Sequence, residues 1–302
     1  MKSHEVVQEQ IQMILSSILE VVTDLAAGLL GNGTFRRHFH LLLSALLVFG
    51  PLLSLWVSSY SVFAKRTHFL YRVFLRSGWG WTCIFVGSFI FVLSFSVRRS
   101  FKLSLRHLSR LAVAGGLWLA FQKLFYLLEN ATGSCYEPLS SSLELSSGAN
   151  GDGQPLLLLR EDETKESCVR AGMLWRGYEV SEEALLLCLC CLLLAEETAV
   201  FGPYLSLGGP SGAPLRILFL LCVLLLVLWL FLLLCLLAYF PEFPTQLLGG
   251  ALGCLSWRAL YQGWYRLGPR WYCPGRPGVG LLSTQFKHDE TSEAPIHSKR
   301  NN

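Results

Sequence analysis

Histidines are the residues of this chain best suited to acid–base or nucleophilic chemistry, yet their spacing builds no catalytic set. A histidine can attack phosphorus or carry a proton near neutral pH, so a hydrolase often holds two of them close together. The seven are His4, His38, His40, His68, His107, His288 and His297. The sequence contains no HExxH, GxSxG or phosphate-loop motif. Spacing alone therefore predicts no catalytic centre, no metal site and no cofactor.

Ionisable residues inside apolar stretches are the second group of candidates, because a charge in hydrocarbon is costly. They are Lys123, Glu129, Glu196, Glu197 and Arg258. One interpretation is that the three glutamates lie near helix ends and reach interfacial water. The other is that Lys123 or Arg258 pairs with an acid across the interior of a helical bundle and holds the helices in register.

Membrane-spanning helices are the elements that must position these residues. Residues 217–240 read ILFLLCVLLLVLWLFLLLCLLAYF, which is 24 residues without a charge and, as a helix, longer than the ~30 Å hydrocarbon core of a bilayer. The chain is 52% hydrophobic and 15% charged, against about 25% charged in soluble domains. The net charge of +4 is modest, so we expect no nucleic acid partner.

The sequence predicts an all-α integral membrane bundle of six transmembrane helices. We expect a cytosolic N-terminus over 1–37, a membrane domain over 38–264 and a cytosolic tail over 265–302. Each expected span has the length that a bilayer requires. The spans are 38–58, 79–97, 109–129, 181–201, 215–240 and 246–264.

An amphipathic helix is predicted before the first span. Residues 11–30 carry apolar residues at helical spacing, with Glu20 and Asp24 one turn apart on the other face. Two acids in mid-bilayer would cost roughly 5–7 kcal/mol, so this helix is expected to lie at the membrane interface rather than cross it.

The distribution of lysine and arginine predicts that both termini are cytosolic. With that orientation the cytosolic segments hold 15 of these residues and the lumenal segments hold eight, which agrees with the positive-inside rule. The basic stretch 98–110 (RRSFKLSLRHLSR) contributes most. This stretch could attract anionic lipid headgroups, at about 1 kcal/mol per residue. The alternative is that it serves only as a topological anchor.

A polar loop over 130–178 falls on the lumenal side in this orientation. Its sequon, Asn130-Ala131-Thr132, makes Asn130 a glycosylation candidate. An oxidising lumen would join Cys135 and Cys168, the cysteines of this loop, in a disulfide. The middle of the loop, 140–155, has the composition of a disordered segment.

Seven short segments between about residues 75 and 266 stand in an order typical of one family. They are WGWTC (79–83), RHLSRL (106–111), TGSCYEPL (132–139), WRGY (175–178), AEETAVF (195–201), GAPLR (212–216) and FLLLC (231–235). In this order they resemble the fat-storage-inducing transmembrane (FIT) proteins, and three of them resemble the type 1 branch. The resemblance implies a six-span protein of the endoplasmic reticulum that binds triacylglycerol and diacylglycerol and promotes lipid droplet formation.

Two positions depart from the family's catalytic pattern. Type 2 members are similar to acyl-CoA diphosphatases, and the resemblance implies two lumenal catalytic histidines in them. Here Glu183 stands at the first position and Pro241 at the second. A carboxylate repels a phosphoanhydride and a proline cannot transfer a proton, so we expect the phosphatase step to be absent. The alternative is a lumenal acyl-CoA diphosphatase that uses other groups.

Neutral glycerolipids are the partners expected of a non-catalytic protein, since each methylene buried from water contributes about 0.8 kcal/mol. The candidate lipid-binding residues are Ser181, Leu185, Leu186 and Leu187, although these leucines could equally face bulk lipid. A transporter would need a polar path, which the spans do not offer. At the C-terminus, Lys299 and Arg300 resemble a dibasic retrieval signal of the reticulum membrane.

Overall fold

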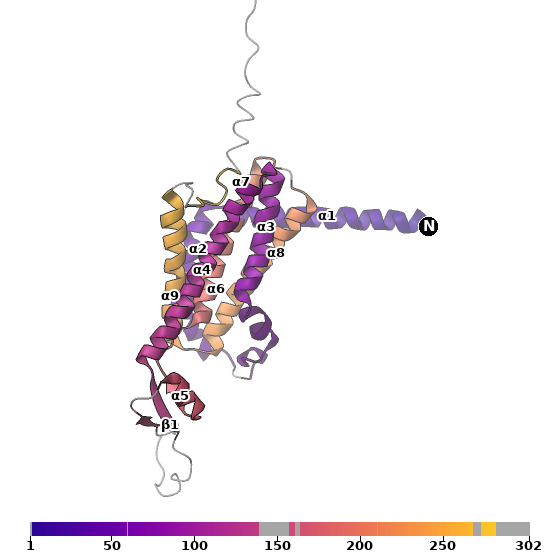
Figure 1. Ribbon diagram of the computed structural model, residues 1–302. Coiled ribbons are helices and arrows are strands. Elements are labelled where there is room, and N and C mark those ends of the chain that lie inside the picture. Colours follow the sequence, from indigo (N-terminus) through magenta and orange to yellow (C-terminus); the bar gives the residue numbers. More distant parts are fainter. Residues whose placement is uncertain are drawn as a thin grey trace, which may run out of the picture. The chain divides into compact units, whose positions relative to one another are not determined.

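The chain folds into two compact units, Met1–Gly116 with Ser181–Asn302, and Leu117–Val180. The computed structural model describes residues 2–58, 60–138, 157–160, 164–209, 211–267 and 273–281. Long apolar helices lying side by side make up most of the first unit (Figure 1). The predicted all-α membrane bundle is therefore confirmed.

Some helices of the bundle are joined by short turns, whereas longer segments with secondary structure of their own separate others. The longer ones are α1 (Lys2–Gly31), α2 (Gly33–Phe49), α3 (Gly78–Arg98), α4 (Phe101–Thr132), α6 (Glu182–Thr198), α8 (Ala213–Tyr239) and α9 (Phe243–Trp257). A 3₁₀ segment, Gly50–Leu55, extends α2, and a short helix α7 (Phe201–Ser206) follows α6. A π-helical turn, Arg258–Gly263, and a 3₁₀ turn, Trp264–Leu267, follow α9.

Among the described residues, six helices are long and apolar enough to cross a membrane: Val7–Gly31, Gly33–Leu55, Gly78–Val97, Phe101–Thr132, Glu182–Ser206 and Ala213–Tyr239. Five of them overlap expected spans. The expected span 246–264 differs, because α9 ends at Trp257 and the backbone then changes to π-helical hydrogen bonding. Val7–Gly31 also meets the criterion by length and composition, although α1 runs crosswise to α3 and α8 (Figure 1). The interfacial position of 11–30 stays a prediction.

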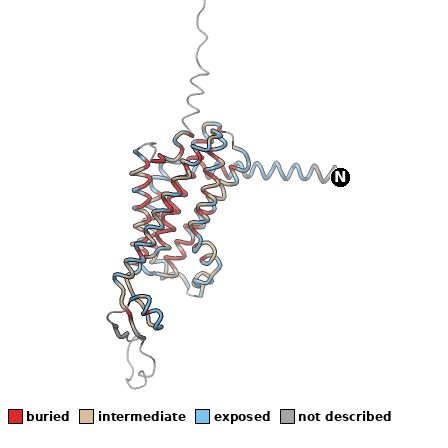
Figure 2. Tube along the Cα trace, in the orientation of Figure 1, coloured by how far each residue is buried: buried red, intermediate tan, exposed pale blue. Residues whose placement is uncertain are grey.

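The helix α6 is the centre of the first unit. Every residue from Ala184 to Ala195 is buried, and α3, α8 and α9 pack around it. Figure 2 shows the buried residues concentrated along the inner helices, whereas the far part of α1 is exposed. A helix that is apolar on every face, such as LLLCLCCLLL here, is suited to complete burial among other helices.

Glycines in α9 allow that helix to approach α6 at backbone distance. A Cβ atom added to Gly249 would lie 2.2 Å from the carbonyl oxygen of Ser181, and one added to Gly253 would lie 2.7 Å from that of Leu185. The two glycines are four residues apart, which is the small-xxx-small spacing typical of helix pairs in membranes. The amide of Ser181 also donates to the carbonyl of Thr245, at 3.2 Å.

The second unit contains a small sheet that the sequence analysis did not predict. Strand β1 (Ser134–Pro138) pairs antiparallel with β2 (Leu157–Arg160) on one side and with β3 (Leu174–Arg176) on the other. A disulfide joins Cys135 of β1 to Cys168 of helix α5 (Lys165–Arg170). Residues 140–155, expected to be disordered, lie outside the described residues.

The glycosylation candidate Asn130 lies in the last turn of α4 rather than in a loop. The Thr132 hydroxyl of the same sequon donates to the carbonyl of Leu128 at 2.8 Å and accepts from the amide of Tyr178 at 2.9 Å. Sequons that carry glycans are typically found in surface loops. Glycosylation of Asn130 stays a prediction, and it would require this turn to open.

Candidate functional site

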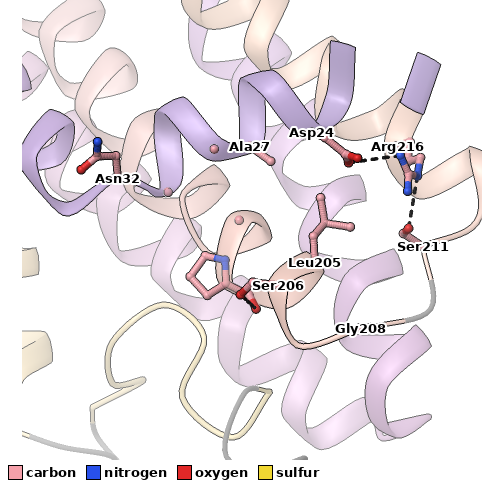
Figure 3. Close-up of a pocket in the computed structure, with 13 residues that line it drawn as sticks. Asp24, Ala27, Asn32, Leu205, Ser206, Gly208, Ser211 and Arg216 are labelled. Carbon is pink, nitrogen blue, oxygen red and sulfur yellow. Dashed lines mark hydrogen bonds and ion pairs between the residues drawn. The ribbon is translucent and has the colours of Figure 1, made fainter. Parts of the chain in front are cut away.

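A pocket of about 780 Å³ lies where the C-terminal part of α1 meets α7 and the start of α8 (Figure 3). It is lined by Asp24, Ala27, Gly28, Gly31, Asn32, Gly202, Pro203, Leu205, Ser206, Gly208, Gly209, Ser211 and Arg216. Close packing of glycines forms its base, since the Cα atom of Gly202 lies 3.2 Å from where a Cβ atom of Gly31 would stand. The volume is that of a site for a molecule of drug or lipid size.

Arg216 is the charged centre of this pocket. Its guanidinium donates to the Glu20 carboxylate at 3.0 Å, to Asp24 at 3.3 Å and to the hydroxyl of Ser211 at 3.1 Å. Figure 3 shows the Asp24 and Ser211 contacts converging on the arginine from two sides. The Arg216 side chain is only 13% exposed, whereas the two carboxylates are more than half exposed. One cation and two anions give the cluster a formal charge of −1.

An apolar groove of about 410 Å³ begins beside the same cluster. Residues of α1 and α8 line both hollows: Ile217 of the groove directly follows Arg216 of the pocket, and Val22 of the groove lies two residues before Asp24. The lining is entirely aliphatic: Leu19, Val22, Ile217, Leu220, Leu221, Val223, Leu224 and Val227. The same two helices therefore contribute charged and polar residues to the pocket and aliphatic residues to the groove.

The family-equivalent positions Glu183 and Pro241 lie away from this pocket, where α6 begins and α8 ends. Ser181 caps α6, and its hydroxyl accepts from the amide of Ala184 at 3.2 Å. Glu183 is partly buried in the first turn of α6, and Pro241 lies in the turn between α8 and α9. Glu242 follows Pro241 and pairs with Arg66 at 3.6 Å, an exposed contact.

Of the histidines that the structure describes, His68 is the one that lies towards this end of the bundle. Its ring lies 5.3 Å from that of Phe63, which in turn contacts Tyr239 at 6.5 Å between ring centres. Its Nδ1 atom accepts from the amide of Leu70 at 3.3 Å. Burial raises the pKa of the nearby Tyr71 hydroxyl, which donates to the Phe63 carbonyl at 3.0 Å. Within the described residues no second histidine joins His68, so the pair that a histidine phosphatase needs does not form there.

The predicted lipid-binding residues occupy a different environment from the expected one. Leu185, Leu186 and Leu187 are 1%, 6% and 1% exposed, so they pack against neighbouring helices and face neither a lipid-accessible surface nor bulk lipid. Ser181 is engaged as the helix cap. The sequence could not place these leucines, because an apolar helix has a similar composition whether lipid or other helices surround it.

A buried polar cluster joins α4, α6 and the turns after α9. Arg110 donates to both carboxylate oxygens of Glu197, each at 2.7 Å, and its third nitrogen lies 2.7 Å from Nδ1 of His107. The Tyr261 hydroxyl donates to the same carboxylate at 2.8 Å. Arg110 and Glu197 are each 2% exposed. This bidentate pair fixes the relative position of three segments distant in the sequence.

The partner of Glu197 was not predicted. The interpretation that pairs Lys123 or Arg258 with one of the acids was wrong. Lys123 and Arg258 are exposed, and the acids bond to other residues: Glu197 to Arg110, Glu196 to Arg36 and Glu129 to Lys165. Glu197 is buried, so the other interpretation, that it reaches interfacial water, is wrong for this residue. Arg110 was assigned to the basic stretch 98–110, although it already lay inside the expected span 109–129. Most of that stretch is helical, because α4 begins at Phe101.

The part of the chain that the structure describes holds six candidate spans, one of which contains the buried helix α6, and these define a multi-pass helical membrane protein. Within that class, the chain belongs to the fat storage-inducing transmembrane protein family, whose model matches residues 59–207. The chain is 86% identical to fat storage-inducing transmembrane protein 1 of Danio rerio over 95% of this chain and 99% of that protein. The retrieval residues Lys299 and Arg300 lie outside the described residues.

More distant relatives separate into two groups. The mouse fat storage-inducing transmembrane protein 1 is 43% identical over 89% of this chain and 86% of its own length. The mouse protein named acyl-coenzyme A diphosphatase FITM2 is 29% identical over 83% of this chain and 90% of its own length. No solved structure matches the chain.

Proposed function

We propose that this protein resides in the endoplasmic reticulum membrane and promotes fat storage and lipid droplet formation by holding triacylglycerol and diacylglycerol, without catalysis. The observation that carries the proposal is that α1 and α8 line both the polar pocket at Arg216 and an aliphatic groove. The acyl chains would lie along the groove. The ester or hydroxyl oxygens would lie near Arg216 and Ser211.

Selectivity in such a site comes from its polar part. Lipid tails are as apolar as leucine, so an acyl chain gains little by moving from the bilayer into the groove, and the methylene contribution expected for transfer from water does not apply. A glyceride oxygen that accepts a hydrogen bond from Arg216 or Ser211 does gain, because hydrocarbon offers it no donor. The net charge of −1 in the Arg216 cluster disfavours anionic phospholipids and favours neutral glycerides.

The absence of catalysis is supported by the family-equivalent positions. A diphosphatase of this family would need a nucleophile and a proton-transfer group; on the resemblance described above, Pro241 can be neither, and Glu183 replaces the first histidine with an anion that repels a phosphoanhydride. Glu182, Glu183 and Glu242 gather negative charge at that end of the bundle, which opposes a phosphoanhydride. The relatives named as type 1 proteins are also more similar to this chain than those named diphosphatases.

Neutral-lipid storage in cells tests the proposal. Leu220→Trp with Val223→Trp would fill the groove, and we expect stored neutral lipid to fall close to that of cells lacking the protein. Phe231→Trp places the same side chain on α8 outside the groove and should have no effect. A third variant, Glu183→His with Pro241→His, restores the family histidines and should leave droplet formation unchanged.

Two outcomes would contradict the proposal. If the groove-filled variant formed as many droplets as wild type, the glyceride would not bind at this site. Droplets that appear only when the histidine pair is present would favour the alternative of a lumenal acyl-CoA diphosphatase. Protein levels and membrane insertion are compared by fractionation in each case.

A further inference from the structure

A second pocket, of about 440 Å³, lies at the end of the bundle where α2 begins and α6 ends. Turns after α9 complete it. Its lining residues are Gly33, Arg36, Arg37, His40, Glu196, Trp257, Tyr261, Gln262, Arg266, Arg276 and Pro277. We call this set the arginine pocket. None of these residues lines the Arg216 pocket or the apolar groove.

The arginine pocket is strongly cationic. Four arginines face one carboxylate, so its formal charge is +3 with His40 neutral. Glu196 forms an ion pair with Arg36 at 2.6 Å, while the adjacent Glu197 points inward to Arg110. Arg37, Arg266 and Arg276 are all exposed. Their guanidinium groups are therefore available to a ligand that carries negative charge.

Two nitrogens in the wall of the pocket have no hydrogen-bond partner within the part of the chain that the structure describes. They are Nδ1 of His40 and Nε1 of Trp257, both buried, and the two rings stack at 5.9 Å. The indole nitrogen can only donate. A buried donor that finds no acceptor in the protein is satisfied by water or by a ligand. Guanidinium, imidazole and indole groups together present donors to a ligand rich in acceptor oxygens.

We propose that the arginine pocket binds the phosphate headgroup of an anionic glycerophospholipid. A phosphate provides the negative charge and the several acceptor oxygens that these donors require, and guanidinium groups contact it in bidentate geometry. The position favours a lipid over a soluble molecule. One candidate span starts at Gly33, and helix α6 ends at Thr198, two residues after Glu196, so the pocket lies at helix ends, near the depth of lipid headgroups.

The two pockets divide the lipids by charge. The Arg216 cluster, with a formal charge of −1, suits a neutral glyceride, whereas the arginine pocket suits an anionic phospholipid. Binding at the arginine pocket does not depend on the proposed function, because it involves other residues at another place on the bundle. A protein that holds both would sense the composition of the membrane in which it collects neutral lipid.

Native mass spectrometry of the detergent-solubilised full chain tests the inference. The probes are dioleoyl phosphatidic acid, dioleoyl phosphatidylcholine and glycerol 3-phosphate. We expect phosphatidic acid to bind and the other two to bind at least about tenfold more weakly, since each basic residue near a headgroup changes the affinity severalfold. In Arg37→Gln with Arg276→Gln, the affinity for phosphatidic acid should fall about tenfold or more.

Matched variants separate recognition from general charge and from folding. Arg72→Gln with Arg76→Gln removes the same charge from exposed residues outside the pocket and should leave binding unchanged. Arg37→Lys with Arg276→Lys keeps the charge but not the bidentate contacts, and its affinity should lie between those of wild type and of the glutamine variant.

Three results would overturn the inference. Phosphatidylcholine could bind as tightly as phosphatidic acid, or the Arg72 and Arg76 variant could lose as much affinity as the pocket variant. Glycerol 3-phosphate binding as tightly as phosphatidic acid would instead identify a soluble phosphate compound as the ligand. The wild-type comparisons decide between lipid and soluble ligand even if the glutamine variant fails to fold.

Discussion

Glu197→Gln is expected to destabilise the protein by about 3–5 kcal/mol, whereas Glu196→Gln, one residue earlier, should cost about 1 kcal/mol or less. The difference arises from burial. Removing the Glu197 charge leaves the guanidinium of Arg110 uncompensated at 2% exposure, and glutamine keeps only one of the two acceptor oxygens that Arg110 and Tyr261 use. Glu196 pairs with Arg36, whose side chain is 42% exposed and can be hydrated instead.

Thermal unfolding of the purified protein in detergent measures this difference. Because the two glutamates are adjacent on α6, expression, insertion and detergent effects are shared by both variants. We expect a large fall in the unfolding temperature for the Glu197 variant only. Equal unfolding temperatures for the two variants would show that the Arg110–Glu197 pair does not hold the bundle together.

Gly253→Ala should separate α9 from α6 and cost about 1–3 kcal/mol or more, because the added methyl carbon would meet backbone. The Cβ atom would lie 2.7 Å from the carbonyl oxygen of Leu185 and 3.1 Å from the Cβ atom of Cys188. A backbone oxygen of the central helix cannot rotate away as a flexible side chain can. Gly249→Ala is expected to cost more, since its contact with the Ser181 carbonyl oxygen would be 2.2 Å.

Gly80→Ala is the matched control for the helix-crossing glycines. Gly80 lies in α3, and a Cβ atom there would have nothing within 4 Å. We expect it to be neutral or to stabilise the protein by about 0.5–1 kcal/mol, because alanine loses less conformational entropy on folding. Denaturant titration in mixed micelles would rank the free energies of unfolding of the three glycine variants. If Gly253→Ala proved as stable as Gly80→Ala, the close approach of α6 and α9 would be disproved.

The helices could be predicted from the sequence because bilayer thickness fixes their length. The uncharged run 217–240 lies almost wholly within α8, Ala213–Tyr239. The last expected span was less accurate, since the change to a π-helical turn at Arg258 depends on hydrogen bonding that apolar composition does not report. The small sheet of the second unit was missed because the polar composition of 130–178 indicated a loop.

The site was harder to predict than the spans because it depends on which helix faces which. Leu187 and Leu224 are the same residue type in similar runs, yet one is 1% exposed and the other 65%. Arg216 was counted only as a topological charge, and its bonds to Glu20 and Asp24 join positions almost two hundred residues apart. Arg110 was recognisable as an arginine inside an expected span, and this was the signal that could have revealed the buried pair.

Binding and cleavage measured on the same purified protein test the central claim most directly. The full chain in phosphatidylcholine nanodiscs is given a photoactivatable diacylglycerol and, separately, an acyl-CoA. The account predicts saturable labelling of α1 and α8 that falls in the Leu220→Trp and Val223→Trp variant, with no acyl-CoA cleavage. Acyl-CoA cleavage that Glu183→Ala abolishes, or labelling that is unaffected by filling the groove, would contradict it.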